Sequence, residues 1–104
     1  MSDYRTIARL EDVPEKEPTA FEVEGRDVVV IRVDGAVHVL EDRCSHEDFP
    51  LSAGAVLDGQ IECALHGARF EMASGKPKAL PAVQPVKVYD SRVEGDEIQV
   101  RIDS

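Results

Sequence analysis

The sequence predicts an all-β fold built from short strands and tight turns. Residues 98–102 alternate between apolar and polar side chains, which is the period of a half-buried strand. Residues 28–33 are β-branched and nearly continuously apolar, apart from Arg32, which is typical of a central strand buried on both faces. No segment sustains an amphipathic helical period over three turns, so long helices are not expected.

Other segments fit the same class. We expect an edge strand over residues 4–10 and a proline-containing acidic loop over 11–18. Turn residues separate the remaining strand-like segments and predict hairpins. These segments are 20–24, 27–33, 37–40, 86–89 and 98–102, and the turns between them include Gly25-Arg26, Asp34-Gly35 and Glu94-Gly95-Asp96.

Size and charge exclude several functions. The chain has 104 residues, enough for one ordinary domain. Its 12 Lys and Arg against 21 Asp and Glu give a net charge of −9, which argues against nucleic acid and anionic membranes as partners. The longest apolar run, Val28 to Ile31, is too short to span a membrane, and the first residues show no secretory signal. We therefore expect a cytoplasmic protein, in which the two cysteines do not form a structural disulfide.

Residues 42–85 differ in composition from the two strand-rich arms around them. They contain both cysteines, two of the three histidines and four of the six prolines. This segment is interpreted as loops around short strands. Long loops in a compact domain are usually functional.

Two short motifs lie in this segment. Cys44-Ser45-His46 is a Cys-x-His sequence, and Cys63-Ala64-Leu65-His66 is a Cys-x-x-His sequence. Between them, Leu57 to Ile61 carries an Asp-Gly hairpin signal. A hairpin here would bring the two motif-bearing loops side by side.

Each loop then offers one thiolate and one imidazole. Two thiolates on one iron and two imidazoles on the other, with bridging sulfides, match the ligation of a Rieske centre. A structural zinc is the first alternative, although zinc fingers usually run Cys-Cys then His-His. A catalytic Cys–His pair is the second, but it leaves the duplicated motif unexplained. His38 stands alone in a strand pattern and is interpreted as structural.

The motifs and their flanks resemble the Rieske ferredoxin family, in particular the ferredoxins of bacterial aromatic-ring dioxygenases. The resemblance is densest from Arg43 to Val100. It implies a Rieske fold, with an antiparallel β-sandwich base and an inserted subdomain of two cluster-binding loops. We expect a single domain over residues 1–104, with the insert at roughly 42–85. The segments that carry the resemblance are Cys44 to His46, Cys63 to Phe70, Ser74-Gly75 with Pro77, Pro81 and Pro85, and Val93 to Asp96.

The resemblance also implies a function. One 2Fe-2S cluster is expected on Cys44, His46, Cys63 and His66. The protein is expected to be a monomeric one-electron carrier between a flavin-dependent ferredoxin reductase and a terminal oxygenase, without catalysis of its own. An oxygenase's catalytic component would need a mononuclear iron site, and the chain has no histidine after His66. The remaining alternative is the Rieske-like small subunit of a nitrite reductase or another multicomponent oxidoreductase.

The ligand set fixes the charge of the centre. The formal charges of two ferric ions, two sulfides and two thiolates sum to zero. Adding an electron to this neutral centre is therefore easier than adding one to a four-thiolate cluster. Respiratory Rieske proteins, which this sequence resembles in the two loops, add a disulfide and place Ser and Tyr hydroxyls near the sulfurs. Ala68 and Phe70 stand at the matching positions here and cannot donate. We therefore predict the low end of the Rieske range, about −150 mV.

If the loops protrude, electrons should enter and leave through His46 and His66. The residues around the two motifs then form a candidate docking face for the partners. This docking face comprises Arg43, Glu47, Asp48, Phe49, Pro50, Arg69 and Pro81.

Overall fold

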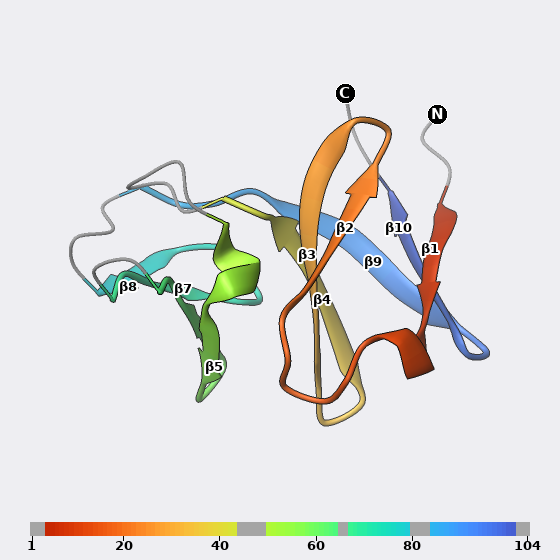
Figure 1. The fold of residues 1–104 in the computed structure, drawn as a ribbon, viewed down its shortest axis with the longest axis horizontal. Coiled ribbons are helices and arrows are strands. Elements are labelled where there is room, and N and C mark those ends of the chain that lie inside the picture. Colours follow the sequence, from red (N-terminus) through yellow and green to blue (C-terminus); the bar gives the residue numbers. More distant parts are fainter. Residues whose placement is uncertain (1–3, 44–49, 65–66, 80–83, 102–104) are drawn as a thin grey trace.

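The structure is a computed structural model that describes residues 4–43, 50–64, 67–79 and 84–101. In these ranges the chain forms two antiparallel sheets with two short 3₁₀ helices (Figure 1). The predicted all-β class is confirmed. None of the described helices is long and apolar enough to cross a membrane. In chain order the elements are β1 (Arg5–Arg9), η1 (Leu10–Asp12), β2 (Thr19–Val23), β3 (Arg26–Val33), β4 (Ala36–Glu41), η2 (Leu51–Ala53), β5 (Ala55–Leu57), β6 (Gln60–Glu62), β7 (Arg69–Glu71), β8 (Pro77–Ala79), β9 (Val88–Glu94) and β10 (Glu97–Arg101).

The larger sheet, called the base sheet here, has the strand order β1-β10-β9-β4-β3-β2. The hairpins β3–β4 and β9–β10 form where the Asp34-Gly35 and Glu94-Gly95-Asp96 signals predict them. β1 pairs only with β10 and lies at the sheet edge, as predicted for residues 4–10. The base sheet therefore consists of local hairpins that two long-range pairings join, β4 with β9 and β1 with β10.

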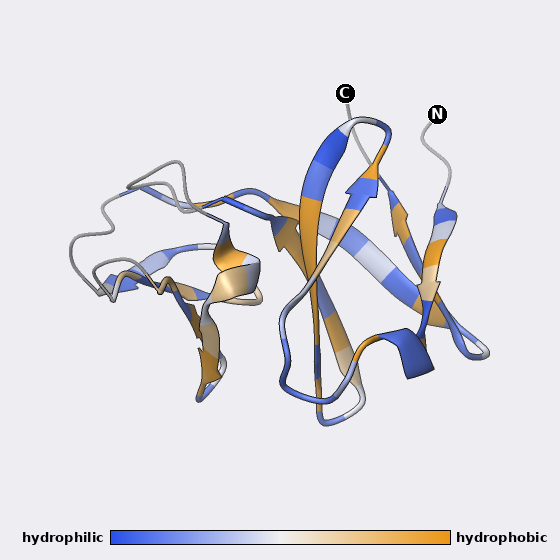
Figure 2. Cartoon of the chain, viewed as in Figure 1, coloured by the Kyte–Doolittle hydropathy of each residue, from blue (hydrophilic) through white to orange (hydrophobic). Residues whose placement is uncertain are grey.

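β3 is the central strand of the molecule. Val28, Val29, Val30 and Ile31 are all fully buried, which confirms the expectation of burial on both faces. Side chains alternate across a strand, so successive residues belong to different cores. Val28 and Val30 pack with residues of the base sheet, whereas Val29 and Ile31 pack toward the smaller sheet. Figure 2 shows the hydrophobic residues that follow β3 and β4 through the middle of the molecule.

The turn between β2 and β3 lies one residue earlier than the predicted Gly25-Arg26. Its central residues are Glu24 and Gly25, with φ of 51° and 78°. A two-residue turn that suits the twist of a hairpin needs positive φ at both positions, and Gly25 adopts this without steric cost. Arg26 is thereby left in the strand, paired with Val23.

The small sheet consists of β5, β6, β7 and β8 in that order. The predicted hairpin over 57–61 is confirmed, since Leu57 pairs with Gln60. Residues 77–79, which lie in the segment interpreted from the sequence as loops around short strands, form strand β8. Pro77 is compatible with this strand because β8 lies at the sheet edge, where a missing N–H costs no inner hydrogen bond. The insert boundaries of 42 and 85 remain a prediction, and all four strands fall between them.

Candidate metal centre

The structure places one of the four predicted ligands. Cys63 directly follows β6, and its side chain is 1% exposed. Cys44, His46 and His66 lie outside the described residues. No group of three His, Cys, Asp or Glu side chains that could hold a metal ion occurs within the described part of the chain. A metal site near Cys63 would therefore need ligands from the neighbouring segments.

The second loop, residues 63–68, is closed at its base. The ladder between β6 and β7 pairs Ile61 with Phe70 and Glu62 with Arg69. One residue further along, the Cys63 N–H donates a hydrogen bond to the Ala68 carbonyl at 2.6 Å and extends this pairing. His66 therefore stands in a short loop whose two ends are held together by backbone hydrogen bonds.

The first loop, residues 43–51, is also closed at its base. Asp42, which follows β4, accepts two hydrogen bonds from Ser52 in η2. The backbone N–H of Ser52 lies 2.7 Å from Oδ1, and its hydroxyl lies 2.8 Å from Oδ2. This pair has no local spacing signal in the sequence, because its two residues are ten positions apart. Cys44 and His46 thus lie in a segment with a fixed beginning and end.

A third segment, residues 76–85, contains β8 and has both ends next to Gly75. Val86 donates its N–H to the Gly75 carbonyl at 2.9 Å, and Gly75 donates to Glu71 at 2.7 Å. The Ser74 hydroxyl lies 2.6 Å from the Glu71 carboxylate and, with help from the Lys78 ammonium, lowers the pKa of Glu71. Val86 was predicted as part of a strand. It precedes β9 but is buried in the core shared with the small sheet.

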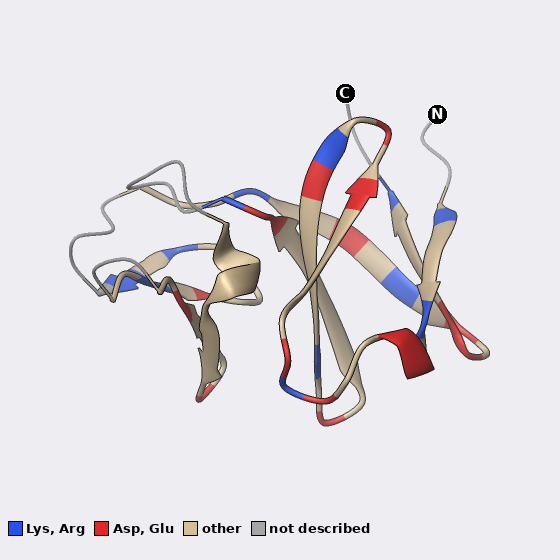
Figure 3. Ribbon diagram, viewed as in Figure 1, with Lys and Arg blue, Asp and Glu red and all other residues tan. Residues whose placement is uncertain are grey.

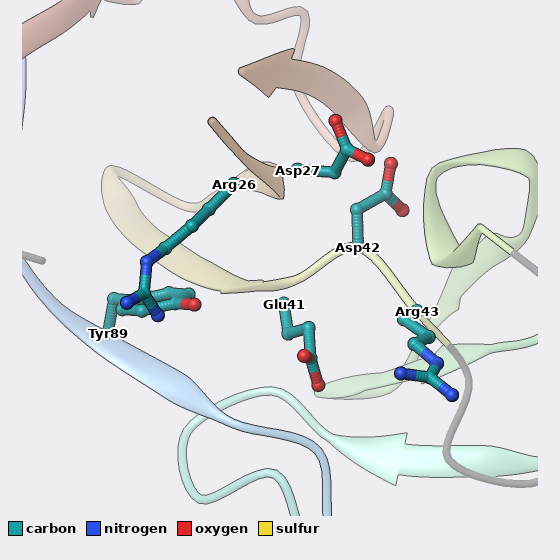
Figure 4. A pocket seen from close by; sticks show the side chains of 6 residues that line it. All are labelled: Arg26, Asp27, Glu41, Asp42, Arg43 and Tyr89. Carbon is teal, nitrogen blue, oxygen red and sulfur yellow. The ribbon is translucent and has the colours of Figure 1, made fainter. Parts of the chain in front are cut away.

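A polar pocket lies where β4 ends and the first loop begins (Figure 4). The Asp42 N–H donates to the Asp27 carbonyl at 3.0 Å, and the two carboxylates lie on the same side of the chain. Glu41 and Arg43 point to the other side. The mixture of charges favours neither a single cation nor an anion as ligand. The lining residues are Arg26, Asp27, Glu41, Asp42, Arg43 and Tyr89.

Among the described residues, the buried side chains that pack with Cys63 are apolar. Ala68 and Phe70 are fully buried in the same core cluster as Cys63, together with Ile61 and Met72. None of these side chains carries a hydroxyl or amide that could donate to sulfur. The residues present fit an iron–sulfur centre, because a buried thiolate in apolar surroundings is a soft ligand in a low-dielectric site.

The candidate docking face is described only in part. Arg43, Pro50 and Arg69 are exposed. Arg69 forms an ion pair with Glu62 at 3.0 Å, an exposed contact of small energetic value. The other four residues lie outside the described ranges; these are Glu47, Asp48, Phe49 and Pro81.

Charge is distributed unevenly between the insert and the base. Residues 42–85 contain four basic and six acidic side chains, so a charge of −7 out of the net −9 belongs to the rest of the chain. Figure 3 shows acidic residues at η1 and at the turns of the base sheet, and basic residues on β7 and β8. Most of the negative charge therefore lies on the base and not on the segment with the two motifs.

Comparison with known proteins identifies the class to which this fold and thiol site belong. Residues 3–90 match the Rieske [2Fe-2S] domain, and the chain belongs to that family. It holds a Rieske-type 2Fe-2S cluster, which decides against the structural-zinc alternative.

Curated relatives are similar over nearly their whole length. The chain is 36% identical over 98 residues to the biphenyl dioxygenase ferredoxin subunit of Pseudomonas sp. (strain KKS102), which covers 93% of this chain and 90% of that protein. It is 37% identical over 92 residues to the ferredoxin component of biphenyl 2,3-dioxygenase from Rhodococcus jostii (strain RHA1), covering 88% of this chain and 86% of the relative. These relatives are ferredoxin components, so this protein is an electron carrier and not a catalytic subunit.

Solved structures of ferredoxins have the same fold as this chain. The ferredoxin of carbazole 1,9a-dioxygenase from Nocardioides aromaticivorans IC177 superimposes with a TM-score of 0.91 and 40% identity, covering 95% of this chain and 97% of that one. A ferredoxin solved in complex with the oxygenase of carbazole 1,9a-dioxygenase gives a TM-score of 0.87 and 26% identity, covering 94% and 92%. A nitrite reductase small subunit from Mycobacterium tuberculosis, at 21% identity and a TM-score of 0.89 with 100% and 98% covered, shows the fold alone.

Proposed function

We propose that this protein carries single electrons from a flavin-dependent ferredoxin reductase to a terminal aromatic-ring-hydroxylating oxygenase in the cytoplasm, acting as a monomer. The observation that carries the proposal is similarity to dioxygenase ferredoxins over 93% of the chain at 36% identity. The solved complex of a related ferredoxin with its oxygenase supports the choice of the oxygenase as electron acceptor. The nitrite reductase alternative rests on a likeness of fold only.

We assign the cluster ligands to Cys44, His46, Cys63 and His66, with the two thiolates on one iron and the two imidazoles on the other. When bound, the cluster accepts and returns one electron. The burial of Cys63 among apolar side chains supports this assignment, because it keeps water from the sulfur. His66 follows Cys63 by three residues in the sequence, and the hydrogen bond between Cys63 and Ala68 joins the two ends of the segment that contains it.

The test is reconstitution of electron transfer from purified components. The protein is mixed with NADH, the flavoprotein reductase and the oxygenase of a biphenyl dioxygenase system. We expect NADH-dependent bleaching of its visible absorption, and ring hydroxylation that requires the protein. The reduced protein should also give a Rieske-type electron paramagnetic resonance signal. If the protein is reduced but never reoxidised by any ring-hydroxylating oxygenase, the proposed acceptor is wrong.

Charge reversal on the docking face should slow partner binding. We expect Glu47→Lys with Asp48→Lys to reduce the rate of reduction by the reductase roughly tenfold at low ionic strength, with a smaller difference as salt is added. Stopped-flow measurement of the rate at several salt concentrations tests this.

The matched control reverses two charges at the turn between β9 and β10, which lies at the far end of the molecule from the small sheet (Figure 1). Glu94→Lys with Asp96→Lys changes the net charge by the same amount. If both double variants slow reduction equally, the effect comes from total charge, and the docking face is misplaced.

A further inference from the structure

We infer that Gly54 is a positioning residue for Cys63, because its lack of a side chain lets η2 and β5 pack directly against the peptide that joins Glu62 to Cys63. The inference rests on the assignment of Cys63 as a cluster ligand made above. It concerns a residue that acts through the strand that carries the thiol.

Gly54 is not required for its backbone conformation. It lies between η2 and β5 with φ of −91° and ψ of −159°, an extended conformation that any residue can adopt. The other six glycines of the chain all have positive φ. The Gly54 N–H donates to the Leu51 carbonyl at 2.9 Å, which any residue except proline could also do. The requirement for glycine at this position is therefore steric.

The steric requirement comes from the Glu62 carbonyl. A Cβ on Gly54 would lie 1.9 Å from the Glu62 carbonyl oxygen and 3.0 Å from its carbonyl carbon. It would also lie 3.2 Å from the Leu51 carbonyl oxygen. All three atoms belong to the backbone, so no side chain can turn away to make room. An alanine at this position must push η2 and β6 apart.

The Glu62 carbonyl belongs to the same peptide unit as the Cys63 N–H. A peptide unit is planar and moves as one body, and in its trans form these two groups point in opposite directions. The Cys63 N–H donates to the Ala68 carbonyl at 2.6 Å, while the Glu62 carbonyl oxygen approaches Gly54. This peptide is therefore held between Ala68 and Gly54, and any displacement of its carbonyl carries Cys63 with it.

η2 also contributes to the core around Cys63. Leu51, its first residue, is fully buried in the same cluster as Cys63, which is 1% exposed. η2 leads directly into β5, whose Ala55 pairs with Glu62 (Figure 1). A helix pushed away from β6 would move Leu51 with it and admit water to the sulfur. Gly54 thus sets both the position of the thiol and its shielding from water.

The expected change in potential follows from the charge of the centre. Reduction takes the proposed cluster from zero to −1, so water near the sulfur favours the reduced state. One hydrogen bond from water to a charged acceptor is enough to raise the ratio of reduced to oxidised protein about tenfold at a fixed potential, which for one electron is a shift of about 59 mV. Replacement of Gly54 should therefore raise the reduction potential.

The experiment compares Gly54→Ala with Gly59→Ala in the cluster-loaded protein. Both variants add one methyl group to the β5–β6 hairpin, at its open end and at its turn. Gly59 has φ of 78° and no atom within 4 Å of an added Cβ, so alanine there strains the turn without pushing on a neighbour. Gly59→Ala therefore controls for a general loss of stability. The reduction potential, the linewidth of the electron paramagnetic resonance signal and the urea midpoint of unfolding are measured for each protein.

We expect Gly54→Ala to raise the ratio of reduced to oxidised protein about tenfold at a fixed potential and to broaden the resonance signal. Gly59→Ala should lower the urea midpoint and leave the potential and the linewidth at their original values. An original potential and linewidth in Gly54→Ala would overturn the inference. Equal changes of these two quantities in both glycine variants would also overturn it, because loss of stability would then account for them.

If Gly54→Ala does not fold, Leu51→Ala decides. It loosens η2 without adding an atom at residue 54, and it should raise the potential and broaden the signal. Leu40→Ala is the matched control, because it removes a buried leucine of the same core from β4, and it should change neither quantity. Original values in Leu51→Ala, or equal changes in both leucine variants, would overturn the inference.

Failure of the proposed function would give a different result. A normal resonance signal without reoxidation by any ring-hydroxylating oxygenase would refute the proposed electron acceptor and leave the comparison of the glycine variants intact. Absence of a Rieske signal in the original protein would refute the ligand assignment itself.

Discussion

Purified Cys63→Ser protein is expected to be colourless and to give no Rieske signal after reduction. Cys63 is 1% exposed and is the described member of the proposed ligand set. A serine oxygen in this apolar position is a harder and far less acidic ligand than a thiolate, and it leaves one iron without a sulfur from this loop. Iron and sulfide analysis together with the visible spectrum measures the loss. Cys44→Ser is expected to behave in the same way.

Histidine variants provide a matched comparison for this prediction. His66→Gln should lose the cluster, whereas His38→Gln should keep it. His38 lies in β4 opposite Ile31, and burial lowers its pKa, so it is an uncharged side chain that glutamine can replace without a change of charge at neutral pH. Retention of the cluster in Cys63→Ser, or its loss in His38→Gln, would contradict the proposed ligand set.

The second large effect is expected on the reduction potential of Ala68→Ser. Ala68 is fully buried in the same core cluster as Cys63, and a hydroxyl at this position would supply a donor that neither the Ala68 nor the Phe70 side chain provides. A hydrogen bond to a charged acceptor is worth about 1.5–3 kcal/mol, which corresponds to a rise of up to roughly 100 mV from a starting value near −150 mV. Equilibrium redox titration of both proteins measures the shift.

Ala8→Ser is the control for this titration, because Ala8 is a buried alanine in the other core. It should leave the potential unchanged. An original potential above about +100 mV, or identical potentials in Ala68→Ser and the original protein, would refute the account of the low potential.

The base sheet could be predicted from the sequence because its elements are long enough to show a period. β3 and its turn carry a β-branched run followed by Asp34-Gly35, and both signals act over neighbouring residues. Three-residue strands such as β7 and β8 are too short to show alternation, and they form because the hairpin β5–β6 offers them an edge. Local pattern therefore specifies the hairpins of both sheets, whereas contacts between distant residues add β7 and β8 to the small sheet and join β1 to β10 and β4 to β9 in the base.

In the site, too, local signals can be read from the sequence and contacts between distant residues cannot. The two Cys and His motifs have fixed local spacings, so the proposed ligands are visible in the sequence. The Asp42–Ser52 pair and the approach of Gly54 to Glu62 are invisible there, because each joins residues eight or more positions apart that meet only in the folded chain. Conversely, the net charge of −9 can be counted from the sequence, but its concentration in the base can be recognised only when the positions of the two sheets are known.

The pairing of β4 with β9 also has a consequence for folding. Glu41 donates its N–H to the Lys87 carbonyl at 2.9 Å. The chain between these two residues therefore forms one long insertion, and its two ends meet in the base sheet. Pairing of β4 with β9 requires the ends of this insertion to come together, and the entropic cost of that closure grows with the number of flexible residues in the insertion. Iron bound to both Cys-His motifs would divide the insertion into shorter flexible segments. Cluster binding is therefore expected to stabilise the base sheet, although β4 and β9 lie outside the insertion. Both sheets of the metal-free chain should unfold at a lower denaturant concentration than those of the cluster-loaded protein.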